Sequence, residues 1–205
     1  MKSILKYFLL FLTIITIISC GKNYSSEDMN YISQVEKSRK EKDDYMKNDP
    51  SSPFNQDTAA HFAPLKYFTI DPEFVFKSKL YGYPTKDTIK IYGTKGEARK
   101  VLKYGYVTWE YKNEKHKINV YKGITRSGVT YYSIWFTDKT TGKETYHVGR
   151  YLDFEVMTDP NYTYTIDFNL AYSPYCSYST KYSCAIPSKD DYIDVAINAG
   201  EKKFQ

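Results

Sequence analysis

"YVTWEYKNEKHKINVY", Tyr106–Tyr121, holds two alternating runs of residues joined by a short polar turn, "KNEK". The apolar and aromatic residues of the alternation are Val107, Trp109, Tyr111, Ile118 and Val120. A period of two is typical of strands that bury one face, because successive side chains point to opposite sides of a sheet. The stretch therefore predicts two neighbouring strands with one buried face.

The same pattern extends over most of the chain from Phe74 onward, with tyrosine, valine and isoleucine in excess. Turn sequences such as "YPTKD", "GTKGE" and "TTGK" separate the runs. Many short strands with brief turns favour an antiparallel arrangement over alternating βαβ units. We predict a mainly β domain over residues 48–205, a single antiparallel barrel or sandwich of about eight or nine strands.

One amphipathic helix is predicted ahead of this domain, over residues 29–47. Its apolar positions are Ile32, Val35, Tyr45 and Met46, with charged residues between them. Ser25 or Ser26 can cap its start. The sequence "NDPSSP" ends it, because a residue that precedes proline disfavours the helical conformation.

The first residues of the chain predict export. Lys2 and Lys6 precede an almost wholly apolar run over residues 7–18, which is short for a membrane-spanning helix. We expect residues 1–19 to be a lipoprotein signal peptide. An uncleaved anchor helix is the alternative, and the polar residues that follow at once disfavour it.

Ser19 directly before Cys20 resembles the lipobox of bacterial lipoproteins. That resemblance implies an acylated Cys20 that anchors the chain in the lipid bilayer, with residues 20–28 as a tether. No aspartate follows the cysteine to mark retention at the inner membrane. The expected location is therefore the cell envelope, at the outer membrane.

The charge is mildly basic and evenly spread. Loss of residues 1–19 removes two lysines and takes the formal net charge from +5 to +3. Lysines alternate with acids, and there is no arginine-rich stripe or nucleic-acid motif. We expect a solvated surface and no nucleic-acid partner.

Two of the three cysteines remain after lipidation, Cys176 and Cys184 in "CSYSTKYSC". Disulfides persist in exported proteins, so we predict that these two are bonded. Zinc is the alternative, but it usually needs four Cys or His ligands, and no histidine is near this pair in sequence. We assign no metal ligand and no cofactor.

The stretch "TGKETYHVGRY", Thr141–Tyr151, joins the predicted strands "YYSIWFTD" and "RYLDFEV". Pairing apolar with apolar residues sets Phe136 opposite Leu152 and Asp138 opposite Arg150. We predict an ion pair between Asp138 and Arg150 at the rim of an apolar face, with Glu144 as the substitute acid. The alternative is that Arg150 serves a ligand.

The next predicted hairpin runs from "RYLDFEV" into "TYTIDFNL". Matching its apolar residues places Asp153 opposite Asp167, and Tyr151 opposite Asn169, on a polar face. Two facing carboxylates imply a raised pKa, a nearby cationic side chain or a bound cation. These four residues form a candidate polar site. A register shifted by two residues, with both acids solvated, is the alternative.

Three ordered blocks of this chain, "FTDKTTGKETYHVGRYLDFEV", "IDFNLAYSPYCSYSTKYSCAIPS" and "DVAINAGEKKF", resemble the core signature of a bacterial family catalogued as domain of unknown function 1684. Upstream, "PLKYFTIDPEF" is also similar to that family. The resemblance covers most of the chain after the tether. It implies no particular reaction, because the family is defined by sequence.

The sequence favours a binding or structural role over catalysis. G-x-S-x-G, H-E-x-x-H, P-loop and G-x-G-x-x-G motifs are all missing from it. We expect a non-catalytic surface domain whose 23 tyrosines supply contact area for a glycan or small molecule. The alternative is a carboxylate-dependent hydrolase of an envelope or extracellular glycan, with Asp153 and Asp167 as acid and base. Convergence of these acids in a concave pocket, rather than on a flat face, would favour the hydrolase.

Overall fold

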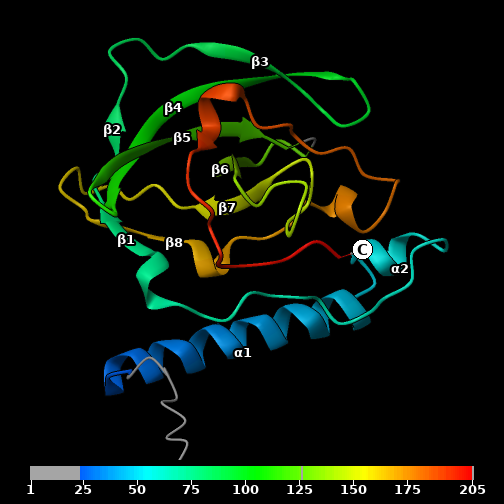
Figure 1. Cartoon of the computed structure of the whole chain (residues 1–205). Helices are drawn as coiled ribbons and strands as arrows, with labels where there is room; N and C mark the ends of the chain where they lie inside the picture. The colour runs from blue at the N-terminus through cyan, green and yellow to red at the C-terminus, as the bar shows by residue number, and fades with distance from the viewer. Residues whose placement is uncertain (1–23, 126, 205) are drawn as a thin grey trace, which may run out of the picture.

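The computed structural model describes residues 24–125 and 127–204, which form a mainly β fold with one long N-terminal helix below it in the view of Figure 1. The predicted fold class is confirmed. The described residues contain nine strands, and these do not close into a barrel but make a sandwich-like arrangement. The predicted signal peptide over residues 1–19, the lipidation site Cys20 and the first residues of the tether lie outside the described part of the chain.

The larger of two sheets forms the body of the fold. In spatial order its main strands are β2 (Tyr81–Gly82), β4 (Ala98–Tyr111), β5 (Glu114–Ile124), β6 (Thr130–Asp138) and β7 (Arg150–Phe154). These neighbours are antiparallel, β3 (Thr88–Tyr92) also pairs with β4, and β9 (Tyr192–Ile193) pairs in parallel with β6. The smaller sheet pairs β1 (Val75–Ser78) with β8 (Tyr164–Asp167).

The quoted stretch Tyr106–Tyr121 forms the β4–β5 hairpin. Val107 stands opposite Ile118. The turn residues Lys112 and Asn113 have φ of 52° and 64°, the left-handed conformation that a tight hairpin requires at both central positions. Val107 and Ile118 are fully buried, as the alternation predicts.

The main core lies between the two sheets. Phe76 of β1 packs against Trp109 of β4 with ring centroids 5.8 Å apart, and Phe168 contacts Phe136 of β6 at 5.3 Å. The smaller sheet thus covers the apolar face of the larger one. The opposite face of the larger sheet is covered in part by the C-terminal segment, whose Ala185 packs with Tyr121 and Trp135.

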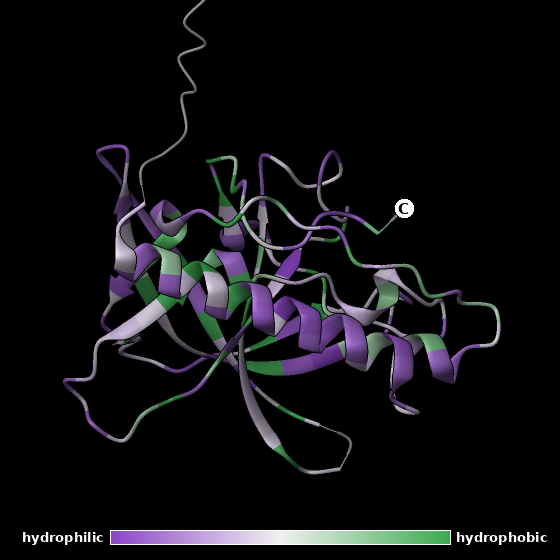
Figure 2. Cartoon of the chain, turned by 90° about the horizontal axis from the view of Figure 1, so that it is seen from below, coloured by the Kyte–Doolittle hydropathy of each residue, from purple (hydrophilic) through white to green (hydrophobic). Residues whose placement is uncertain are grey.

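The long helix α1 (Ser26–Asn48) begins earlier than the predicted residue 29. Ser25 caps it: its hydroxyl accepts the Asp28 N–H at 3.1 Å, and the Asp28 carboxylate accepts the Ser25 N–H at 3.0 Å. Val35 and Met46 are buried against the domain. The other face is hydrophilic, as Figure 2 shows from below.

Polar contacts fix α1 to the β domain. Arg39 donates to the backbone carbonyl of Phe68 at 2.9 Å, and Lys42 pairs with the fully buried Glu201 at 2.8 Å. The remaining helices are short: α2 (Pro53–Gln56), η1 (Pro72–Phe74), η2 (Phe168–Leu170), η3 (Tyr175–Ser177) and η4 (Lys189–Asp191). Within residues 24–125 and 127–204, none of the helices has the length and apolar content needed to cross a bilayer.

The predicted register of β6 and β7 is wrong by two residues. Phe136 stands opposite Arg150, and Ile134 opposite Leu152. Arg150 nevertheless reaches Asp138 diagonally, with Nη2 2.7 Å from Oδ2. Both side chains are fully buried, not at a rim. The apolar match failed as a guide because the carbonyls of Ile197 and Ala199 also accept from Arg150, so the cation is stabilised inside the core although its buried Nε has no partner among the described residues.

The predicted β7–β8 hairpin is also wrong. β8 pairs with β1, so that Asp167 stands opposite Val75 instead of Asp153. The edge of β7 is met by Tyr172, which exchanges two backbone hydrogen bonds with Tyr151, at 2.9 and 3.0 Å. β8 pairs with the distant strand β1 and not with β7, its neighbour in sequence, because this pairing brings Phe76 and Ile166 together in the common core.

Candidate functional site

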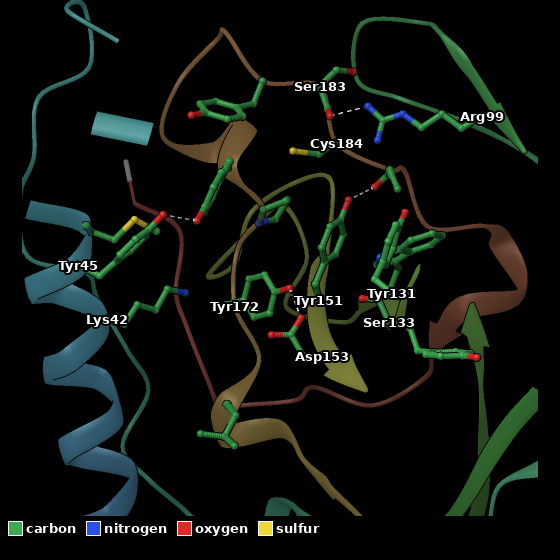
Figure 3. Close-up of a pocket in the computed structure, with 18 residues that line it drawn as sticks. Lys42, Tyr45, Arg99, Tyr131, Ser133, Tyr151, Asp153, Tyr172, Ser183 and Cys184 are labelled. Carbon is green, nitrogen blue, oxygen red and sulfur yellow. Dashed lines mark hydrogen bonds between the residues drawn. The ribbon is translucent and has the colours of Figure 1, made fainter. Parts of the chain in front are cut away.

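An open hollow of about 600 Å³ lies where the C-terminal half of α1, the strands β6 and β7 and the segment 170–185 meet (Figure 3). Its volume is in the range of small-molecule sites. Eight aromatic side chains line it: Tyr45, Tyr131, Tyr132, Trp135, Tyr151, Tyr172, Tyr175 and Tyr182. We call it the aromatic hollow.

The aromatic side chains are held by packing and by hydrogen bonds. Trp135 stacks on Tyr121 with ring centroids 4.7 Å apart and planes at 11°. The Tyr121 hydroxyl donates to the buried Asp191 at 2.7 Å, which fixes the ring behind Trp135. Tyr175 meets Tyr182 edge to face at 5.2 Å. Such rings offer stacking surface at low entropic cost.

Asp153 is the carboxylate of this hollow. It is solvent-exposed, and the Tyr172 hydroxyl donates to it at 2.6 Å. In Figure 3 its side chain lies beside Tyr172, below Tyr151. Lys42 lies 4.8 Å from the centre of the Tyr172 ring, but its ammonium group is paired with Glu201. Asp153 itself forms no ion pair within the described residues, so its second oxygen can accept from a ligand.

Arg99 stands at the opposite end of the aromatic hollow, beside Ser183 and Cys184 (Figure 3). Its Nε donates to Glu97 at 3.1 Å, and its Nη2 donates to the Ser183 carbonyl at 2.6 Å. The hydrogen bond from the Ser183 hydroxyl and the bonds from Arg99 lower the pKa of Glu97 to about 2. Arg99 is therefore held in one orientation by a charged partner.

Three tyrosine hydroxyls of the hollow are neutral hydrogen-bonding groups. Burial raises the pKa of Tyr151, Tyr172 and Tyr175 above the ordinary value of 10. The carboxylate of Asp153 adds to the rise at Tyr172. These hydroxyls stay protonated at physiological pH, so they can position a polar ligand but cannot act there as anionic bases.

The two cysteines lie together at this wall, and Cys184 lines the hollow. Both are free thiols in this structure, and the Cys176 N–H donates to the Cys184 sulfur at 3.1 Å. A hydrogen bond from the Cys184 thiol lowers the pKa of Cys176 to about 7. The disulfide is not formed here, and it stays a prediction.

The four residues of the predicted polar site have different roles. Asp153 and Asp167 are not cross-strand partners, yet both line a smaller hollow of about 280 Å³ that adjoins the aromatic hollow at Leu170 and Tyr172. Tyr151 lines the aromatic hollow and donates to the Ala185 carbonyl. Asn169 is buried.

Asp167 and Asn169 belong to one hydrogen-bonded group. The Tyr31 hydroxyl of α1 reaches both oxygens of Asp167, at 2.8 and 2.9 Å, and Asn169 donates to the Tyr31 oxygen at 2.9 Å. Burial raises the pKa of Asp167, although these hydrogen bonds oppose the rise. Glu144, proposed as a substitute partner for Arg150, is exposed, and its backbone carbonyl accepts from Lys203.

Sequence reasoning missed most of the aromatic hollow. The sequence feature that could have indicated this hollow lies on β6, where Tyr131, Ser133 and Trp135 alternate with the core residues Ile134 and Phe136. Large aromatic residues on both faces of a strand indicate that a second layer covers the outer face. In the described part of the chain, no group of three or more His, Cys, Asp or Glu side chains is arranged to hold a metal ion.

Comparison with known proteins yields a family and a fold. The family described as "Protein of unknown function (DUF1684)" matches residues 60–202. The solution NMR structure of an uncharacterised protein of Haloarcula marismortui is similar, with a TM-score of 0.61 and 26% sequence identity. The match covers 86% of this chain and 96% of that one. No curated protein matches the chain.

Proposed function

This chain belongs to the DUF1684 family of proteins of unknown function, and we propose that it is a membrane-anchored, exported lipoprotein whose domain binds a glycan or small molecule without transforming it. The observation that carries the binding role is the aromatic hollow. Eight aromatic side chains surround about 600 Å³, and rings of this kind stack on sugars and other flat ligands.

Asp153 supports a ligand that carries hydroxyl groups. Its carboxylate is open to solvent and receives a single tyrosine hydroxyl, so it can accept further hydrogen bonds. Ser133, which also lines the hollow, donates its hydroxyl to the Leu152 carbonyl at 3.1 Å and is not presented as a nucleophile.

The anchoring part of the proposal rests on the sequence. Lys2 and Lys6, the apolar run over residues 7–18 and the Ser19-Cys20 junction favour cleavage and acylation at Cys20. Attachment to the lipid bilayer would hold the aromatic hollow close to the envelope, at the outer membrane, where glycans are abundant ligands.

A glycan array probed with the purified mature chain tests the binding role. Tyr182→Ala removes a partly exposed ring of the hollow and should weaken the binding of any glycan hit about tenfold. Tyr192→Ala is the matched control, because that ring is 48% exposed on β9. Equal loss in both variants, or no hit on an array of neutral and acidic sugars, would contradict glycan binding at this site.

A hydrolase is the second candidate, and one observation favours it. Asp153 and Asp167 line the same small hollow, and burial raises the pKa of Asp167. Two carboxyl groups in different environments are the pattern of a general acid and its partner. Chromogenic glycosides test it: turnover should disappear in Asp153→Asn and Asp167→Asn but persist in Asp159→Asn, an exposed acid of the loop before β8.

A further inference from the structure

A second hollow, of about 970 Å³, adjoins the aromatic hollow. The two share a wall that consists of Arg99, Tyr131, Tyr182 and Ser183. A ligand whose ring occupies the aromatic hollow can therefore extend past Arg99 into the second hollow.

The second hollow is strongly basic. Its charged lining residues are Lys95, Arg99, Lys100 and Lys181, against a single carboxylate, Glu97. The ammonium groups of Lys95 and Lys181 donate to backbone carbonyls, at 3.0 and 2.6 Å, and that of Lys181 also lies 3.9 Å from the Asp57 carboxylate. Within the described residues, Lys95 and Lys100 form no ion pair. Clustered cations of this kind raise the local concentration of anions.

Arg99 is oriented for a ligand in the shared wall. Glu97 and the Ser183 carbonyl engage Nε and Nη2, while Nη1 makes no hydrogen bond within residues 24–125 and 127–204. The Arg99 side chain is 37% exposed in this shared wall. A fixed guanidinium whose Nη1 has two free N–H groups can donate a charge-assisted hydrogen bond to a carboxylate oxygen.

The two ends of the composite site differ in charge. Asp153 lies at the β7 end of the aromatic hollow, where it accepts from Tyr172, and Arg99 lies at the β4 end (Figure 3). An acidic group would be repelled by Asp153 and attracted by Arg99 and Lys100, whereas hydroxyl groups suit Asp153. The site therefore imposes one direction on a ligand that is acidic at one end.

We propose that the ligand is an acidic sugar of the hexuronate class, with its ring against the tyrosines of the aromatic hollow and its carboxylate on Nη1 of Arg99. This inference rests on the proposed binding function and narrows it to one ligand chemistry. Arg99 supplies the oriented contact, and Lys100 adds long-range attraction.

A matched pair of sugars tests the proposal. Methyl β-glucuronide and methyl β-glucoside differ only in a carboxylate in place of a hydroxymethyl group. NMR titration of the ¹⁵N-labelled mature chain should show tighter binding of the glucuronide by about tenfold at low ionic strength. Added salt should reduce that preference, because it screens the basic hollow.

Three variants locate the effect. Arg99→Gln and Lys100→Gln should each weaken glucuronide binding more than glucoside binding, and Arg99→Gln should have the larger effect. Lys115→Gln removes the same charge from an exposed position on β5 beside the β4–β5 turn, outside both hollows, and should change neither. Lys100→Gln keeps the test decisive if Arg99→Gln disturbs folding, since Lys100 forms no ion pair in the described chain.

The outcomes separate this inference from the binding function beneath it. Equal affinities for the two sugars, or a preference that survives both Arg99→Gln and Lys100→Gln, would overturn the acidic ligand and leave the binding role intact. Resonances of the aromatic hollow that respond to neither sugar would overturn both proposals.

Discussion

Arg150 is a fully buried cation with three acceptors. Its guanidinium donates to Asp138 and to the carbonyls of Ala199 and Ile197. Asp138 in turn accepts from the Thr140 N–H at 2.6 Å. The desolvation cost of both charges is offset only while all of these partners are present.

Arg150→Ala should lower the free energy of unfolding by roughly 3–5 kcal/mol, because it leaves the Asp138 carboxylate buried without its countercharge. Asp138→Ala should cost a similar amount, and the double mutant less than the sum of the two. Chemical denaturation measures all three. Lys139→Ala, which breaks an exposed pair with Asp194 at 3.0 Å, is the control and should cost about 1 kcal/mol or less. Small and additive effects at Arg150 and Asp138 would contradict the buried pair.

Cys176 should be the more reactive thiol. In the reduced protein the alkylation of Cys176 should rise with pH around a midpoint of about 7. Cys184 should react slowly, because its pKa is raised chiefly by the hydrogen bond to Cys176. Cys184→Ala removes the hydrogen bond and should move the Cys176 midpoint upward. Peptide-resolved mass spectrometry measures both sites.

The predicted disulfide is checked on the unreduced protein. Non-reducing peptide mapping of freshly isolated material should find Cys176 linked to Cys184, because the chain is expected to be exported and the two residues already lie in contact. Two free thiols in that material would count against the bond.

At the scale of elements, the connection between β6 and β7 depends on a glycine. Gly149 has a φ of +115°, and a Cβ there would collide with the backbone carbonyl of Phe136. Gly142, in the same connection, also has a positive φ, +79°, but open space around it. A comparison of substitutions at the two glycines therefore separates the cost of a steric collision from the cost of backbone strain.

Gly149→Ala should therefore destabilise the protein by more than Gly142→Ala, which carries only the backbone strain of about 1 kcal/mol. The excess arises because a backbone atom of β6 cannot move aside without disturbing the ladder that places Arg150. Thermal unfolding of the two variants compares them directly. Equal losses would mean that the approach of Gly149 to β6 does not hold the register.

The contact between Tyr31 of α1 and Asp167 of β8 affects the pKa of the Asp167 carboxyl group. Burial raises the pKa of Asp167 above its ordinary 3.8, and the Tyr31 hydroxyl opposes that rise. Tyr31→Phe should therefore raise the pKa of Asp167 further, which NMR titration of the side-chain carboxyl measures. Ile32→Val, a conservative change on the same helix, is the control.

The effect on stability has a defined sign. The folded state binds a proton at Asp167 more readily than the unfolded state. The protonated carboxyl therefore contributes stability that is complete below the pKa of the unfolded state and is lost as pH rises through the pKa of the folded state. Tyr31→Phe extends that loss to higher pH. Urea unfolding across the acidic range should show it, and parallel curves for variant and wild type would contradict the contact.

At the scale of the whole molecule, the proposed lipid anchor would decide where the aromatic hollow acts. Mass spectrometry of the membrane fraction should find a diacylglyceryl group on Cys20, and Cys20→Ser should release the chain into the soluble fraction. The domain should fold equally well in that variant, because the substitution changes none of the residues of its hydrophobic core. A wild-type chain that is soluble and unmodified would contradict the anchor.

Local patterns in the sequence determined the mainly β class, the N-terminal helix and the alternating faces of the strands, since each depends only on neighbours along the chain. They also brought Asp138 and Arg150 onto one face, although the register was off by two residues. The capping box that starts α1 at Ser26 is equally local.

The tertiary structure alone decided the pairing of β8 with β1, the complete burial of Arg150 and the assembly of the aromatic hollow. Each joins segments far apart in the chain: Lys42, Arg99, Tyr151 and Tyr182 come from four of them. The physical reason is that apolar burial is non-directional and rewards any partner that completes the core. Which distant strand or loop supplies that partner is settled only when all of them are packed together.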